Sequence, residues 1–198
     1  MRRAVLIAGM AEQIPVLEGD YFGIDRGAFL AIHQGFSLKA AIGDFDSISD
    51  AQRSELEKSC PMIVLPVHKN ETDSEAAVKH VLALGYDSIV LYGSLGGRID
   101  HELANLRLMT QRRYPITLMN EKNQLDVLEP GTYTIPKIRK YLSFLALEPS
   151  CISEEHVAYP LVHQAIDVQD VYTISNEIKD QAVVTIHEGR VIMIQSDD

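Results

Sequence analysis

The sequence has 198 residues, of which 46% are hydrophobic and 23% charged, so it fits one large or two small globular domains and excludes a disordered chain. Its formal net charge of −10 argues against a nucleic-acid backbone as the main partner, because such binding needs a basic surface. An acidic protein also repels polyphosphates, so we expect any phosphate chemistry to depend on a divalent metal.

The sequence shows no pattern typical of a membrane span or a secretory signal. The apolar runs are too short to span a bilayer, and the basic start Met1-Arg2-Arg3 leads into a short run that makes a poor signal peptide. Cys60 and Cys151 belong to no metal-binding pattern, so we expect two free thiols. These observations favour a cytoplasmic protein with no membrane partner.

The first part of the chain alternates short apolar runs with helical segments. The alternation predicts a parallel sheet with helices on its faces. The expected strands are residues 4–9, 21–25, 40–43, 62–65 and 88–93, and the expected helices are 26–34, 50–59, 73–84 and 98–113.

After about Asn123 the helical patterns stop and only short β-type runs remain. Glu188-Gly189 separates the last two runs and suits a tight hairpin. We therefore expect an α/β domain over residues 1–123 and an antiparallel β-sandwich or flattened barrel over 124–198, with the boundary between Met119 and Leu128. The expected strands of this second domain are residues 131–135, 141–147, 171–174, 183–187 and 191–195.

Two carboxylates follow the third expected strand, in the sequence Gly43-Asp44-Phe45-Asp46-Ser47. In an extended or turn backbone, residues two apart can point to one side. Mg²⁺ prefers oxygen ligands and usually takes one or two carboxylates plus substrate phosphates. The alternative is a loop in which Asp44 and Asp46 cap turns through their side chains.

A third acid stands at a predicted helix start. Thr72 and Glu75 have the spacing of a capping box, which accounts for both residues structurally. Asp73 lies in the first turn near Lys69 with its carboxylate unassigned. It is either a functional acid or a residue that complements the helix dipole.

A glycine-rich loop, Gly93-Ser94-Leu95-Gly96-Gly97, joins the fifth expected strand to a helix. Such loops before helix N-termini bind phosphates, although the Walker pattern is absent here. On the helix, Ile99, Leu103 and Leu106 share an apolar side. A separate polar side carries Arg98, His101 and Asn105, with Asp100 in the same turn. Arg98 suits bidentate phosphate contact.

In the second domain, Ser175-Asn176-Glu177 reads as an ordinary turn between strands, and the residues alone assign it no function.

Taken together, these motifs resemble the thiamine pyrophosphokinase family. The order matches over nearly the whole chain: Gly-Asp-Phe-Asp-Ser, then Lys-x-x-Thr-Asp-x-Glu, Gly-Gly-Arg-x-Asp-His, Tyr-Pro-Leu and Ser-Asn-Glu. The segment from Ile24 to Gly27 is similar to the family's Ala-Asp-Gly-Gly, with Arg26 in place of a glycine.

The resemblance implies a homodimer with thiamine bound near the subunit interface, close to Ser175 and Asn176. It implies that Mg²⁺ is held by the catalytic acids, which are Asp44, Asp46, Asp73 and Asp100. It further implies ATP and phosphate contacts from Asp25, Lys69, Gly96, Gly97, Arg98, His101 and Asn105.

The implied reaction is attack by the thiamine hydroxyl on the β-phosphorus of ATP, with AMP leaving. One of the acids is expected to accept the hydroxyl proton; which one stays open. Two alternatives remain: an Mg-dependent phosphotransferase with another alcohol as acceptor, and a catalytically silent nucleotide sensor. The presence of all four acids disfavours the sensor.

Overall fold

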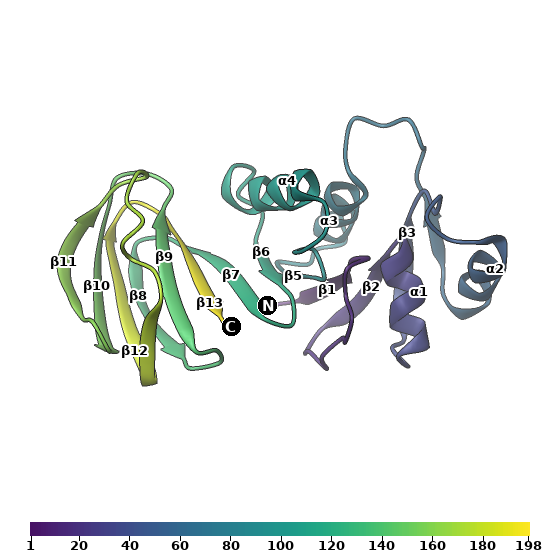
Figure 1. The fold of residues 1–198 in the computed structure, drawn as a ribbon. Coiled ribbons are helices and arrows are strands. Elements are labelled where there is room, and N and C mark those ends of the chain that lie inside the picture. Colours follow the sequence, from purple (N-terminus) through teal and green to yellow (C-terminus); the bar gives the residue numbers. More distant parts are fainter. The chain divides into compact units, whose positions relative to one another are not determined.

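The computed structural model describes all residues from 1 to 198, which divide into two compact units, Met1–Glu121 and Lys122–Asp198 (Figure 1). The first unit is built on parallel strands with helices and the second on antiparallel strands, as the sequence predicts. Each unit has its own hydrophobic core.

Six strands form the sheet of the first unit, in the order β6-β5-β1-β2-β3-β4, and every neighbouring pair is parallel. The sequence did not predict β6, because a run of four residues is too short to show a period. The strands are β1 (Arg3–Ile7), β2 (Asp20–Ile24), β3 (Leu38–Gly43), β4 (Met62–Val64), β5 (Ser88–Tyr92) and β6 (Ile116–Met119).

Four helices connect these strands: α1 (Arg26–His33), α2 (Asp50–Ser59), α3 (Asp73–Ala83) and α4 (Ile99–Thr110). None has the length and apolar composition needed to span a membrane. At the start of α3, Thr72 Oγ1 accepts the predicted bond from the Glu75 amide at 3.1 Å. The reciprocal half of the capping box is missing, because the Glu75 carboxylate instead pairs with Lys79 at 3.0 Å.

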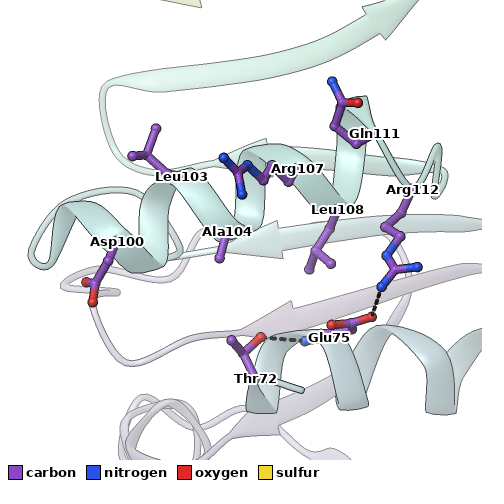
Figure 2. Close-up of a pocket in the computed structure, with 9 residues that line it drawn as sticks. All are labelled: Thr72, Glu75, Asp100, Leu103, Ala104, Arg107, Leu108, Gln111 and Arg112. Carbon is purple, nitrogen blue, oxygen red and sulfur yellow. Dashed lines mark hydrogen bonds and ion pairs between the residues drawn. The ribbon is translucent and has the colours of Figure 1, made fainter. Parts of the chain in front are cut away.

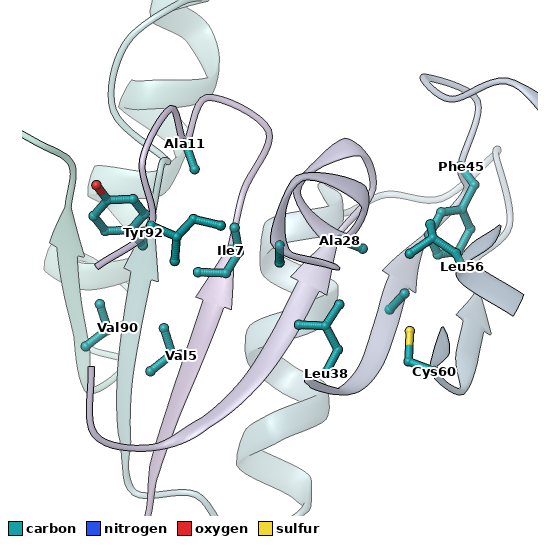
Figure 3. Packing of buried hydrophobic residues seen from close by; sticks show 13 residues of the cluster. Val5, Ile7, Ala11, Ala28, Leu38, Phe45, Leu56, Cys60, Val90 and Tyr92 are labelled. Atoms are coloured by element: carbon teal, nitrogen blue, oxygen red, sulfur yellow. The ribbon is translucent and has the colours of Figure 1, made fainter. Parts of the chain in front are cut away.

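One hydrophobic cluster of the first unit lies between the sheet and α1. Val5 and Ile7 of β1 pack in the same cluster as Ala28 of α1 and Tyr92 of β5 (Figure 3). A Cβ on Gly23 would overlap Ala28, so glycine lets α1 approach the sheet closely.

The apolar side predicted for α4 is not the side that packs. Ile99 is 66% exposed and Leu103 is 51% exposed, whereas Asn105, Leu108 and Met109 are buried. Burial of Asn105 is tolerated because its amide donates to the Ser94 carbonyl oxygen at 3.0 Å. The helix is therefore rotated so that a polar residue supports the glycine-rich loop.

The second unit is an all-antiparallel arrangement of seven strands. Strand β12 joins its two parts: it pairs with β9 at Asn176 and Glu177, and with β8 and β10 along the rest of its length. The strands are β7 (Asn123–Leu128), β8 (Gly131–Pro136), β9 (Tyr141–Ala146), β10 (Ser150–Val157), β11 (Leu161–Ile166), β12 (Asn176–Glu188) and β13 (Val191–Ser196).

One predicted strand of this unit is wrong. Residues 171–174 form no strand, although Val, Tyr, Thr and Ile are typical strand residues. Thr173 is instead buried, where its hydroxyl donates to the Phe144 carbonyl oxygen at 2.6 Å. Strands β7, β10 and β11 went unpredicted. In β10 the register shifts once against β11 and twice against β12, so polar and apolar residues lose simple alternation.

Candidate active site

A cavity of about 510 Å³ lies at the carboxyl edge of the parallel sheet, where ligands bind in open α/β folds. Its walls come from the ends of β1, β2, β3 and β5 and from the starts of α1, α3 and α4. The residues predicted from the sequence that line it are Asp25, Asp44, Asp46, Asp73, Gly96, Arg98, His101 and Asn105.

Three carboxylates meet in this cavity. Oxygen atoms of Asp25, Asp44 and Asp73 lie within 4.8 Å of one another, and all three side chains are half-buried. Sequence reasoning placed Asp44 and Asp73 together but gave Asp25 only a phosphate contact. Asp46 and Asp100 do not belong to this group.

Asp25 is held by the strand next to its own. Its amide donates to the Ile42 carbonyl oxygen at 3.1 Å, and its Oδ1 accepts from the Phe45 amide at 3.1 Å. Burial is the main cause that raises the pKa of Asp25 to about 6, and the charges of Asp73 and Asp44 add to it against the opposing Phe45 bond. This crowded negative charge favours a cation in the cavity.

Lys69 supplies one positive charge to the group. Its Nζ lies 2.9 Å from Asp73 Oδ1 and 3.6 Å from Asp44 Oδ2, and it donates to the Pro66 carbonyl oxygen at 3.2 Å. Burial works against the ammonium ion, but the two ion pairs prevail and raise the pKa of Lys69. Lys69 therefore stays charged and neutralises only part of the three carboxylates.

The two remaining predicted acids have different surroundings. The Asp46 amide donates to Asp44 Oδ1 at 3.2 Å, which is the turn-capping bond expected of the alternative interpretation. Asp44 therefore both caps a turn and belongs to the carboxylate group. Asp100 accepts two bonds from Arg98, at 3.1 and 2.6 Å. The Arg98 bond lowers the pKa of Asp100 to about 2.

The glycine-rich loop lies beside the carboxylates. Gly93, Gly96 and Gly97 have φ of 71°, 95° and 87°, which side chains disfavour. The Gly96 amide donates to Glu102 of α4, so a carboxylate occupies the place where a phosphate oxygen is expected. The sequence gave no signal for this role of Glu102, or for Arg26, which also lines the cavity.

A second cavity of the first unit, about 470 Å³ in volume, separates α3 from α4 (Figure 2). Leu103, Ala104 and Leu108 line it from α4, and Asp100 stands at one end. At the other end Glu75 lies 3.7 Å from Arg112. Asp100 lines this cavity and not the one that holds the three carboxylates.

The second unit has a cavity of its own, about 320 Å³ in volume. Ser175 and Asn176, predicted to lie near thiamine, both line it. Sequence reasoning missed Glu154, which is 2% exposed and also lines the cavity, because it stands in a polar run that gives no sign of burial. The other lining residues are Tyr159, Leu161, Tyr172, Thr173 and Ile174.

Comparison with known proteins decides the family. Residues 21–119 match the thiamin pyrophosphokinase catalytic domain, and residues 132–192 match the thiamin pyrophosphokinase vitamin B1 binding domain. The chain belongs to the thiamin pyrophosphokinase family. Each matched segment falls inside one of the two units, and the family resemblance read from the motifs is confirmed.

Individual thiamin pyrophosphokinases are similar over their whole length. The thiamine pyrophosphokinase of Bacillus subtilis (strain 168) is 30% identical over 209 residues, which cover 98% of both chains. A crystal structure of a thiamin pyrophosphokinase family protein from Enterococcus faecalis is 30% identical, with a TM-score of 0.88 over 100% of both chains. The Bacillus subtilis crystal structure is 27% identical, with a TM-score of 0.86 over 100% of both.

Proposed function

We propose that the protein transfers a diphosphoryl group from ATP to the hydroxyl of thiamine, forming thiamine diphosphate and AMP. The observation that carries the proposal is the group of three carboxylates beside a glycine-rich loop, at the sheet edge of a chain in this family. A diphosphoryl transfer needs charge neutralisation and positioning more than covalent chemistry, and this edge offers both.

The carboxylate group fits Mg²⁺. Three oxygen donors within 4.8 Å carry more negative charge than Lys69 balances, and hard divalent cations prefer carboxylate oxygens. Asp25, Asp44 and Asp73 would hold the ion. When bound, Mg²⁺ neutralises charge on the phosphate oxygens.

The remaining groups of the cavity would position ATP. The Gly96 and Gly97 amides stand just before α4, where backbone donors and the helix dipole favour phosphate; a phosphate oxygen at Gly96 would replace the Glu102 carboxylate. Arg98 and His101 line the same cavity, and Lys69 lies close enough to Asp73 to serve the same phosphates. Asn105 acts through its bond to Ser94, which holds the loop.

Thiamine is assigned to the cavity of the second unit. Ser175 and Asn176 line that cavity, and the residues around it match the vitamin B1 binding domain. Tyr159 and Tyr172 supply the aromatic surface in a chain without Trp.

We also propose a homodimer in the cytoplasm. Six large hydrophobic residues between positions 159 and 174 are exposed, and association would remove them from water: Tyr159, Val162, Val168, Val171, Tyr172 and Ile174. Both cysteines are free, in keeping with a reducing compartment.

The deciding experiment measures AMP release from ATP with thiamine, with other small alcohols and with no acceptor, each with and without excess chelator. We expect AMP only with thiamine and only when a divalent cation is present. Release with a different alcohol would favour another acceptor, and nucleotide binding without AMP would favour a sensor. Full activity in excess chelator would contradict the metal assignment.

A further inference from the structure

The cavity of the second unit contains a buried carboxyl group whose role the motifs do not explain. Glu154 of β10 is 2% exposed and lines the cavity together with Asn176 and Ser175. It takes part in a single hydrogen bond, accepted by Oε2 from Asn176 Nδ2 at 3.1 Å. A buried carboxyl normally uses both oxygens, so Oε1 has capacity for a ligand.

Asn176 has no such capacity. Its Nδ2 donates to Glu154 and, at 2.9 Å, to the Tyr159 carbonyl oxygen. Its Oδ1 accepts from the amides of Tyr159 and Glu177, each at 3.0 Å. With both donors and both acceptor positions in use, Asn176 positions the cavity wall, and Glu154 is the buried polar group left for a ligand.

We propose that Glu154 binds the aminopyrimidine ring of thiamine, with its free oxygen accepting a hydrogen bond from the exocyclic amino group. This inference rests on the proposed function and names the residue that selects the acceptor. Thiamine offers an N–H donor and carries a positive charge on its thiazolium ring. A buried carboxylate needs both, because an unpaired buried charge is costly. Glu154 thereby favours a cation that carries an amino group over a neutral alcohol of similar size.

The charge state of Glu154 agrees with that geometry. Burial raises the pKa of Glu154 to about 7, against the opposing Asn176 bond. No charged neighbour contributes to this shift. The other titratable groups of the cavity are the phenols of Tyr159 and Tyr172.

Charged groups elsewhere around β10 lie outside the cavity. On β10 itself Glu155 and His156 are exposed. On the neighbouring strands β11 and β12, His163 and His187 stack on each other beside Ser153, and Lys179 and Asp180 of β12 are exposed. A cation that binds at Glu154 should therefore release a proton near neutral pH.

The first test compares Glu154→Gln with Glu155→Gln, a matched change on the exposed neighbour of the same strand. Glu154→Gln should raise the KM for thiamine about 10- to 100-fold and leave kcat within a few-fold, because a charge-assisted bond to the substrate is lost. Glu155→Gln should match the wild type. Glu154→Leu, whose side chain offers no acceptor, provides a second variant if the first folds poorly.

The second test changes the ligand. An analogue with a 4-oxo group in place of the 4-amino group lacks the donor and should be a poor substrate for the wild type. Glu154→Gln offers an amide donor, so its preference for thiamine over the oxo analogue should fall at least about 10-fold. An unchanged preference, or unchanged KM values for thiamine in both Glu154 variants, overturns the inference.

Calorimetry separates this inference from the proposed function. Thiamine is titrated into the wild type and into Glu154→Gln at pH 6.5 in two buffers of different ionisation enthalpy. Proton release that disappears in the variant supports the role of Glu154 even if no AMP is formed. If the wild type makes thiamine diphosphate and the variants bind thiamine equally well, the proposed function stands and the inference fails. If the wild type does not bind thiamine, both fail.

Discussion

At the scale of single residues, an ion pair at the start of α4 uses the charged groups of both partners, so neither group is free for a ligand while the pair lasts. Arg98 donates to both oxygens of Asp100, and both side chains are exposed. Two parallel N–H donors also match two phosphate oxygens. ATP would therefore compete with Asp100 for the same guanidinium group.

We predict that Arg98→Lys lowers kcat/KM for ATP about 10- to 100-fold, because an ammonium group keeps the charge but loses the planar pair of donors. The KM for thiamine should change little, since a cation avoids this residue. Arg53→Lys on α2, an exposed arginine paired with Glu57, is the control and should behave like the wild type. Steady-state kinetics with each substrate varied in turn checks the prediction, and a defect confined to thiamine would contradict it.

Glu154 gives a prediction for stability against pH. Its pKa is about 7 in the folded protein and about 4.5 when unfolded, so the folded state holds the proton more tightly. The folded protein therefore loses stability as pH rises from about 4.5 to about 7, and the loss is complete above that range. Glu154→Leu removes this loss, so its free energy of unfolding relative to the wild type should rise by roughly 1–3 kcal/mol between pH 5 and pH 8.

Chemical denaturation of both proteins at the two pH values measures that difference. Glu155→Gln removes an exposed carboxyl from the same strand, and its free energy of unfolding relative to the wild type should stay nearly the same at both pH values. The prediction fails if the free energy of unfolding of Glu154→Leu relative to the wild type stays constant or falls between pH 5 and pH 8. Glu154 would then not destabilise the folded protein as a buried acid.

At the scale of elements, the ends of β2 and β3 shape the carboxylate group. The two strands run parallel with Ile24 opposite Ile42, so Asp25 emerges next to Gly43. A Cβ on Gly43 would overlap Asp25 Oδ1. The glycine in the Gly-Asp-Phe-Asp-Ser motif thus makes room for the first carboxylate.

We predict that Gly43→Ala abolishes the stabilisation of the protein by Mg²⁺, because the added methyl group forces Asp25 out of its position. Thermal unfolding with and without Mg²⁺ measures the effect: the wild type should gain a few degrees and the variant none. Gly35→Ala, at φ 84° with open space around its Cβ, is the control. This variant should lose about 1 kcal/mol of stability and so unfold at a lower temperature. Its unfolding temperature should still rise when Mg²⁺ is added.

The sequence predicts elements well where the pattern is long and simple. Helices α2 and α3 are capped by Ser49 and Thr72, whose hydroxyl oxygens accept hydrogen bonds from amides of the first turn. Patterns fail where tertiary context decides. Strand β10 has three register shifts against its two neighbours and contains the buried Glu154, and residues 171–174 have strand composition but form a loop.

The candidate site also has a part that the sequence predicts and a part that only the tertiary structure shows. Motif order predicts that Asp44 and Asp73 lie at one sheet edge, because parallel strands end together. Nothing in the sequence shows that Asp25 completes their group, since this depends on the register of β2 against β3. The separation of Asp100, which pairs with Arg98, also depends on side-chain geometry that spacing does not encode.

At the scale of the whole molecule, each unit matches one domain of the family and has a candidate ligand cavity of its own. The first unit has the acidic cavity and the glycine-rich loop, and the second has the cavity with Glu154. Exposed hydrophobic residues gather in the second unit between Tyr159 and Ile174.

We predict a dimer of twice 22.1 kDa by sedimentation at micromolar concentration. Val162→Lys should shift the protein towards the monomer, because it puts a charge among exposed apolar residues that association would bury. Val67→Lys, the same change at an exposed valine of the first unit, should leave the mass unchanged. A fully active wild-type monomer would contradict the prediction.

The four hydrogen bonds of Asn176 have a consequence for the speed of binding. They tie the end of β10, the Tyr159 backbone and the start of β12 together before any ligand arrives. A wall that is already ordered requires no folding step when thiamine enters. Association in rapid mixing should therefore be a single phase whose rate rises linearly with thiamine concentration, and Asn176→Ala should add a slow, concentration-independent phase as the wall reassembles around the ligand.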